Sequence, residues 1–207
     1  MSSSVLVSRF AAAQQRLAGL GASLRTPRRW VQSVLPNSAH DVGVSASEDL
    51  PAGPGLDELV GTVEQDCQDL LGVVMRRCDG RIGSRRGRLY DLAVMLTSAE
   101  YMRELNERFR GVASPTDVLS FGVPDDQAAV FAQLPEDVAV PIGEVAIAVP
   151  VAEEAARERG HTLRDEMRIL LVHGVLHLLG WDHENSEEEA RAMVCLPRSD
   201  ASDDVGV

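Results

Sequence analysis

Two different spacings of apolar residues alternate along the middle of the chain, and this alternation constrains the fold more than any other feature. Helical periodicity marks residues 56–75, whereas residues 89–96, 116–121 and 142–149 are short apolar runs of the strand type. Capping residues predict further helices over residues 97–109, 150–159 and 162–179. Thr97 with Glu100 suits a capping box at the first of these helices, and Gly111 suits its end. Strands interleaved with helices predict an α/β (α+β) fold, with helices packed on a small mixed β-sheet.

Composition narrows the possible functions. The chain has 207 residues, 44% of them hydrophobic and 25% charged, which is typical of one globular domain. All 20 basic residues are arginine, so chemistry that requires a lysine is excluded. The three cysteines show no C-x-x-C spacing, which argues against a thiolate metal site or a disulfide framework. No apolar run approaches the roughly 20 residues of a membrane-spanning helix, so we expect no membrane association.

The first part of the chain differs from the rest in charge. Residues 1–40 contain five arginines and seven serines but no acidic residue, and their apolar residues follow one helical stripe. This composition is typical of an organelle transit peptide and predicts a mitochondrial or plastid location. The alternative is a bacterial extension without a targeting role, on a protein of the bacterial cytoplasm. Residues 41–55 are predicted to be a flexible linker, residues 56–196 the folded domain, and residues 197–207 a disordered acidic tail.

Three of the five histidines fall within eleven residues, at positions 173, 177 and 183. His173 and His177 are four apart, so on a helix they share one face and can bind one ion. Gly180 ends the helix and lets His183 supply a third ligand. Three nitrogen ligands leave a fourth position open for water, which is the arrangement of a catalytic zinc ion (Zn²⁺) rather than a structural one. The alternative is that the two helical histidines are buried core residues.

Two residues next to the predicted ligands bear on the chemistry of this metal site. Asp182 suits a ligand-orienting role, and a turn-stabilising role fits it nearly as well. Gly174 stands where a zinc peptidase of the H-E-x-x-H type carries its general base. Peptide hydrolysis by that mechanism is therefore disfavoured.

Three segments together resemble the YbeY family of metal-dependent endoribonucleases. They are residues 173–183 (HGVLHLLGWDH), residues 109–121 with FRG followed by PTDVLSF, and residues 142–147 (IGEVAI), in which Glu144 replaces the more usual aspartate. The resemblance covers roughly residues 56–194. It implies a zincin-like helix with one zinc ion on His173, His177 and His183, and it places Arg110 at the family's active-site arginine. It also implies maturation of small-subunit ribosomal RNA and ribosome quality control, with ribosomal RNA and the small subunit as candidate partners. Weak RNA binding by the acidic chain would indicate a ribosomal protein as a further partner, one that delivers the substrate.

For this activity we expect a metal-bound water to cleave single-stranded RNA, with Arg110 and His177 as catalytic residues and Arg110 clamping a phosphate. Thr116, Asp117 and Ser120 are expected to line the cleft, although Ser120 suits a buried strand equally well. Whether water or the 2′-hydroxyl of the RNA attacks is left open by the sequence.

The charge balance opposes RNA binding overall, because all 32 acidic residues lie beyond residue 40. Local clusters of arginine offset this, and a solvated surface loop is the alternative interpretation of them. The RNA-binding candidates are Arg76, Arg77, Arg81, Arg85, Arg86, Arg88, Arg103 and Arg108. Besides the endoribonuclease, two hypotheses remain: a non-catalytic ribosome-assembly factor with structural zinc, and a zinc peptidase.

Overall fold

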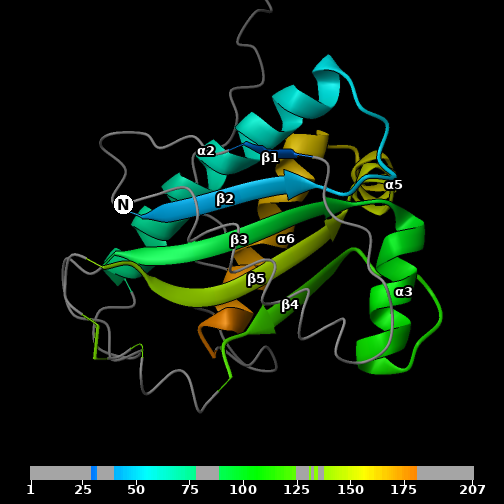
Figure 1. The fold of residues 1–207 in the computed structure, drawn as a ribbon. Helices are drawn as coiled ribbons and strands as arrows, with labels where there is room; N and C mark the ends of the chain where they lie inside the picture. The colour runs from blue at the N-terminus through cyan, green and yellow to red at the C-terminus, as the bar shows by residue number, and fades with distance from the viewer. Residues whose placement is uncertain are drawn as a thin grey trace, which may run out of the picture.

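The computed structural model describes residues 29–31, 40–77, 89–124, 131, 133–134 and 138–180. Within these ranges strands and helices are interleaved along the chain (Figure 1). The strands are β1 (Arg29–Val31), β2 (Asp41–Ala46), β3 (Tyr90–Thr97), β4 (Val118–Gly122) and β5 (Val140–Ala148). The helices are α2 (Pro54–Arg77), α3 (Ala99–Arg110), α5 (Val149–Arg159) and α6 (Leu163–Leu178).

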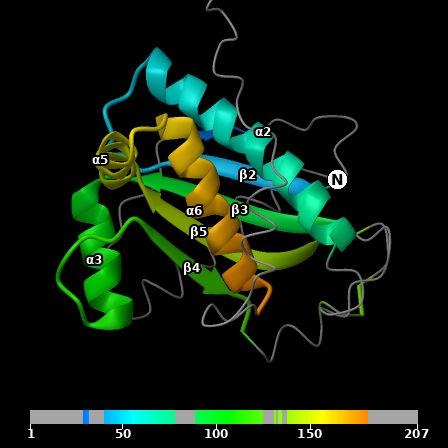
Figure 2. The same cartoon turned by 180° about the vertical axis from the view of Figure 1, so that it is seen from behind.

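The strands form one mixed sheet in the order β1-β2-β3-β5-β4. The central strands β2, β3 and β5 are parallel, and the two edge strands β1 and β4 are antiparallel to their neighbours. Helices α2 and α6 lie side by side on one face of the sheet, as seen in Figure 2, while α3 lies where β4 begins and β5 ends and packs against both strands. The predicted α/β fold is confirmed.

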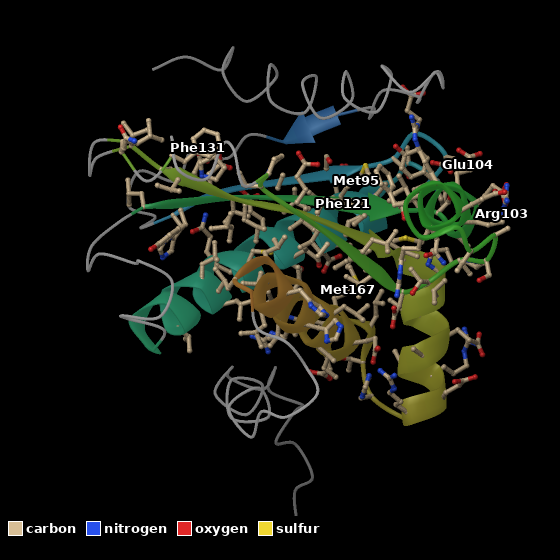
Figure 3. The ribbon with its side chains drawn as sticks, turned by 90° about the horizontal axis from the view of Figure 1, so that it is seen from below. Met95, Arg103, Glu104, Phe121, Phe131 and Met167 are labelled. Carbon is tan, nitrogen blue, oxygen red and sulfur yellow. The ribbon has the colours of Figure 1, made fainter. Side chains whose placement is uncertain are left out.

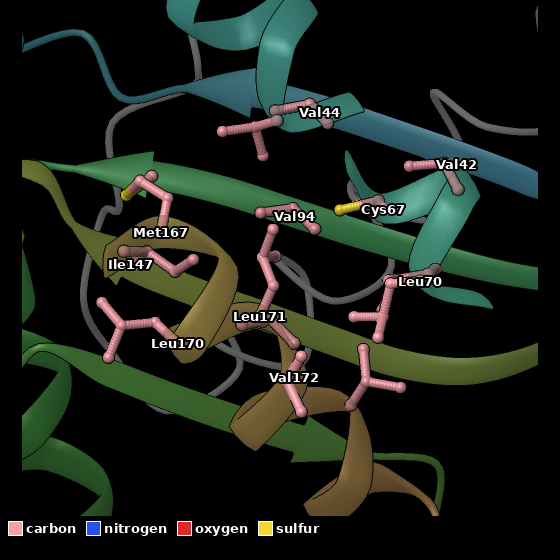
Figure 4. Packing of buried hydrophobic residues seen from close by; sticks show 14 of the residues in the cluster. Val42, Val44, Cys67, Leu70, Val94, Ile147, Met167, Leu170, Leu171 and Val172 are labelled. Atoms are coloured by element: carbon pink, nitrogen blue, oxygen red, sulfur yellow. The ribbon is translucent and has the colours of Figure 1, made fainter. Parts of the chain in front are cut away.

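Alternating side chains of the strands supply two separate cores. Val94, Val145 and Ile147 belong to the larger core, beneath α2 and α6, and Figure 4 shows part of its packing. The intervening Ala146 and Ala148 belong to a smaller core with Tyr101, Met102 and Leu105 of α3. Because successive side chains of a strand point to opposite faces, β5 contributes alternate residues to the two cores.

The helix ends follow from local capping. Thr162 accepts a hydrogen bond from the Asp165 backbone N–H, and the Asp165 side chain accepts from the Thr162 N–H, so the capping box of α6 is complete. Gly111 ends α3 in the left-handed region at φ 72°. The N-cap of α3 is Ser98 rather than the predicted Thr97. Thr97 is fully buried and donates its hydroxyl to the Ile147 carbonyl at 3.3 Å, which keeps it in β3.

The predicted linker at residues 41–55 is wrong in its first half. Residues 41–46 form β2, because Val42 and Val44 are buried in the core and the strand pairs in parallel with β3. Strand β1 lies within the predicted transit segment and pairs with β2. Residues 1–28, 32–39 and 197–207 lie outside the described residues. No helix in the described part of the chain is long and apolar enough to cross a membrane.

Candidate metal centre

Helix α6 carries His173 and His177 near its carboxyl end. Their ring centroids are 4.7 Å apart and the ring planes are inclined by 86°. Bonds of about 2.0–2.1 Å from a tetrahedral ion would place two imidazole centroids about 5 Å apart. His173 is half-buried and His177 is exposed. In spacing and in donor chemistry, the pair therefore fits two ligands of one zinc ion.

The third predicted ligand, His183, lies outside the described residues, and so does Asp182. Gly180 has φ 77°, which agrees with its predicted role as the left-handed stop after α6. Among the residues that the structure describes, no group of three or more His, Cys, Asp or Glu side chains is placed to hold a metal ion. The structure thus brings two of the predicted ligands together and leaves the third untested.

Gly174, directly after His173, lets α6 lie close to the sheet. A Cβ atom built at this position would stand 2.9 Å and 3.1 Å from the two γ-methyl groups of Val145, and 3.2 Å from the Ser120 Oγ. A glutamate here would force the helix away from β5, since a branched valine has little freedom to move. Packing as well as sequence therefore disfavours the general base of an H-E-x-x-H peptidase.

Strand β4 supplies the residues that were predicted to line the cleft. Ser120 donates its hydroxyl to the Gly174 carbonyl at 3.2 Å, so it contacts the histidine helix directly. Thr116 and Asp117 instead organise the start of the strand: Asp117 Oδ1 accepts from the Val118 N–H at 2.8 Å and from the Thr116 hydroxyl at 3.2 Å. The structure supports proximity to the histidines for Ser120 only.

Arg110 is the last residue of α3 and is exposed. The preceding Phe109 packs edge-on against Phe121 of β4, with ring centroids 5.0 Å apart. Arg110 therefore extends from a helix end that β4 holds in place.

The other arginines of α3 differ in their surroundings. Arg103 bonds to Glu100 and Glu107 on the outer side of the helix (Figure 3), which satisfies its guanidinium locally and raises its pKa. The hydrogen bond from Arg103, with its charge, lowers the pKa of Glu100. Arg108 lies 6.0 Å from the centre of the Phe109 ring. The candidates Arg81, Arg85, Arg86 and Arg88 lie outside the described residues, and nothing is described of the Arg76 and Arg77 side chains.

An ion cluster that sequence reasoning missed anchors α6 to α2. Asp66 of α2 is buried and accepts two hydrogen bonds from Arg164, at 2.9 and 3.0 Å. The buried Arg168 adds a contact of 3.2 Å to the same carboxylate. The Asp66 hydrogen bond raises the pKa of Arg164. No sequence signal could reveal a pairing between residues 98 positions apart.

A second cluster lies at the turn between α5 and α6. Glu166 is fully buried, and its carboxylate contacts Arg159 and, at 2.6 Å, the Nε2 of His161. The sequence shows His161 here but gives no reason to connect it with Glu166. Both clusters anchor the amino-terminal half of α6. The half that carries the histidines packs against β4 and β5 instead.

The fold and the site define an α/β domain with a histidine pair on a sheet-packed helix. The sequence model of the family described as endoribonuclease YbeY matches residues 61–198. The chain belongs to the YbeY family of endoribonucleases, so the sequence-based assignment to a nuclease family is confirmed.

Two relatives named endoribonuclease YbeY illustrate the similarity. The protein of Symbiobacterium thermophilum is 35% identical over 66% of this chain and 86% of its own length. That of Gloeobacter violaceus is 50% identical over 50% of this chain, and the match spans 52% of its length. A solution structure of a Thermotoga maritima protein matches 75% of this chain and 84% of its own, with 27% identity and a TM-score of 0.43. Both named relatives are bacterial, and the organelle location stays a prediction.

Proposed function

We propose that this protein is a zinc-dependent endoribonuclease that cleaves single-stranded segments of small-subunit ribosomal RNA during maturation and quality control. One observation carries the proposal: the two imidazoles of His173 and His177 lie 4.7 Å apart on one face of α6. Membership of the endoribonuclease YbeY family supports RNA as the substrate class.

The histidines would hold the ion together with His183. A zinc ion in such a site supplies Lewis acidity towards a phosphodiester and lowers the pKa of water. The half-buried His173 would bind from the side of the sheet and the exposed His177 from the solvent side. The RNA backbone can therefore approach from solvent without displacing the core.

Arg110 would bind the phosphate. A guanidinium matches two phosphate oxygens in a bidentate geometry, and it remains positively charged at every physiological pH. Its position at the end of a helix exposes it for this contact. Lysine has no such planar pair of donors, so Arg110→Lys is expected to recover little of the function lost in Arg110→Ala.

The test is cleavage of small-subunit ribosomal RNA by wild type, His177→Ala and Arg110→Ala, with Arg157→Ala as a control. Arg157 is an exposed arginine on α5 whose partner is Glu154. We expect Arg110→Ala to cleave about 10²- to 10³-fold more slowly, His177→Ala to lose zinc and activity together, and Arg157→Ala to match wild type. Undiminished cleavage by His177→Ala would refute the proposal, and so would an inactive wild type that retains its zinc.

The ends of the products identify the nucleophile. Attack by water leaves no cyclic product, whereas attack by the neighbouring 2′-hydroxyl leaves a 2′,3′-cyclic phosphate. We propose water, because a metal ion held by the histidine pair suits the activation of water. A substrate with a 2′-deoxy nucleotide at the cleavage site should then still be cleaved.

A further inference from the structure

Two consecutive residues of the edge strand β4 point in opposite directions, as residues of a strand do. Ser120 faces α6, where it reaches the Gly174 carbonyl. Phe121 packs with the smaller core on the α3 side, where it meets Phe109. Each of the two residues therefore contacts a different helix.

Ser120 contacts α6 at a residue that lies between the two histidines in the chain. Gly174 stands between His173 and His177, and its carbonyl accepts from the serine hydroxyl at 3.2 Å, where a Cβ atom would crowd both Ser120 and Val145. This hydrogen bond links β4 to the main chain of α6 between the two histidines. It contributes to the placement of both imidazoles relative to β4.

Phe121 contacts Phe109, the residue that directly precedes Arg110. Phe109 is 42% exposed, and its ring packs edge-on against that of Phe121, at 5.0 Å between centroids. Edge-to-face aromatic pairs stabilise a contact beyond the burial of their area. This contact holds the carboxyl end of α3, from which Arg110 extends.

The strand between these contacts is itself fixed. Ser120 pairs with Val145 and Phe121 with Glu144 in the antiparallel register of β4 with β5. At Gly143, φ is 138°, and a Cβ there would lie 2.5 Å from the Phe121 carbonyl oxygen, so a side chain would push the strands apart. The chain Arg110–Phe109–Phe121–Ser120–Gly174–His173 therefore contains only bonded or directly packed neighbours.

We infer that Ser120 and Phe121 are positioning residues, which set the distance between Arg110 and the histidine pair across strand β4. The inference rests on the proposed function of the site. Ser120 acts on the metal through α6, and Phe121 acts on the phosphate-binding arginine through α3. Neither residue touches the substrate in this role.

Cobalt binding tests Ser120 without reference to nuclease activity. Co²⁺ reports ligand geometry by its visible absorption, whereas Zn²⁺, with a filled d shell, does not. Ser120→Ala is expected to weaken Co²⁺ binding about tenfold, as for other residues that orient metal ligands, and to alter the spectrum. Ser120→Thr keeps the hydroxyl and should restore both.

The matched control is Ser45→Ala. The Ser45 hydroxyl is also directed at a backbone carbonyl, that of Val94 in β3 at 3.5 Å, but Ser45 lies on β2. A role in stability alone would lower the melting temperature in both variants and leave Co²⁺ binding unchanged in both. Wild-type Co²⁺ affinity and spectrum in folded Ser120→Ala would overturn the inference.

A double-mutant cycle tests Phe121. Phe121→Leu is expected to lower kcat/KM about tenfold in the wild-type background and to have no further effect in Arg110→Ala, with Co²⁺ binding unchanged in both. Equal losses in the two backgrounds would contradict a role through Arg110. An inactive wild type with normal Co²⁺ binding would refute the proposed nuclease function, and the cobalt result would still decide the role of Ser120.

Discussion

Gly174 decides how closely the histidine helix can approach the sheet, because its missing Cβ makes room for Val145. Gly174→Ala should gain up to about 1 kcal/mol of helix propensity but lose about 1–3 kcal/mol to overpacking, so we expect net destabilisation in urea unfolding. Gly61 of α2 is the matched control, since a Cβ there meets nothing within 4 Å. Gly61→Ala should be stabilising, and an equal gain in Gly174→Ala would contradict the close packing.

Cys67 makes stability depend on alkaline pH. The thiol is fully buried, and this burial raises its pKa, with nearby Asp66 and Glu64 adding to the shift. Above the ordinary thiol pKa of roughly 8.5, the unfolded chain releases a proton that the folded chain keeps, so stability falls as pH rises. We expect a loss of about 1 kcal/mol between about pH 8.5 and 9.5, measured by urea unfolding under reducing conditions. The same decline in Cys67→Ala would show that another group is responsible.

At the scale of elements, α6 is held at its amino-terminal half by the charge cluster with α2. Asp66→Ala would leave the buried Arg168 without this carboxylate and should cost about 3–5 kcal/mol, as for other buried pairs broken on one side. Thermal or urea unfolding measures the loss. Glu154→Ala removes an exposed pair with Arg157 and is the control, with stability expected to stay at the wild-type value. Equal stability of the two variants would show that the Asp66 cluster does not anchor α6.

Local patterns predicted the elements well and the contacts between them poorly. The strand at residues 142–149 and the helix at residues 162–179 were placed within about two residues, because periodicity and capping are encoded locally. Strand β2 was missed because it precedes a Pro- and Gly-rich stretch, and its burial comes from pairing with β3 and from packing against α2. Likewise, spacing alone predicted the pair of His173 and His177 on one helical face. The links from Ser120 to Gly174 and from Phe121 to Phe109 depend on which face of β4 each side chain takes.

For the whole molecule, electrostatics opposes the proposed substrate. The chain has a formal net charge of −12, so its overall field repels RNA and binding depends on arginines that meet phosphates directly. Affinity for single-stranded RNA should therefore fall steeply with salt, by a log–log slope of about 0.7 for each phosphate contacted. Fluorescence anisotropy with a labelled oligonucleotide over a range of salt concentrations measures this slope.

Variants of two arginines on α3 distinguish a specific phosphate contact from a general effect of the protein's charge. Arg110→Ala should reduce the slope by about 0.7, which is the loss of one phosphate contact. Arg103→Ala removes the same formal charge from α3, but Glu100 and Glu107 already satisfy this guanidinium, so its slope should match wild type. If both variants reduce the slope equally, RNA senses only the overall charge of α3. A reduction confined to Arg110 would mean that this negatively charged protein binds RNA through a phosphate contact at the end of the helix.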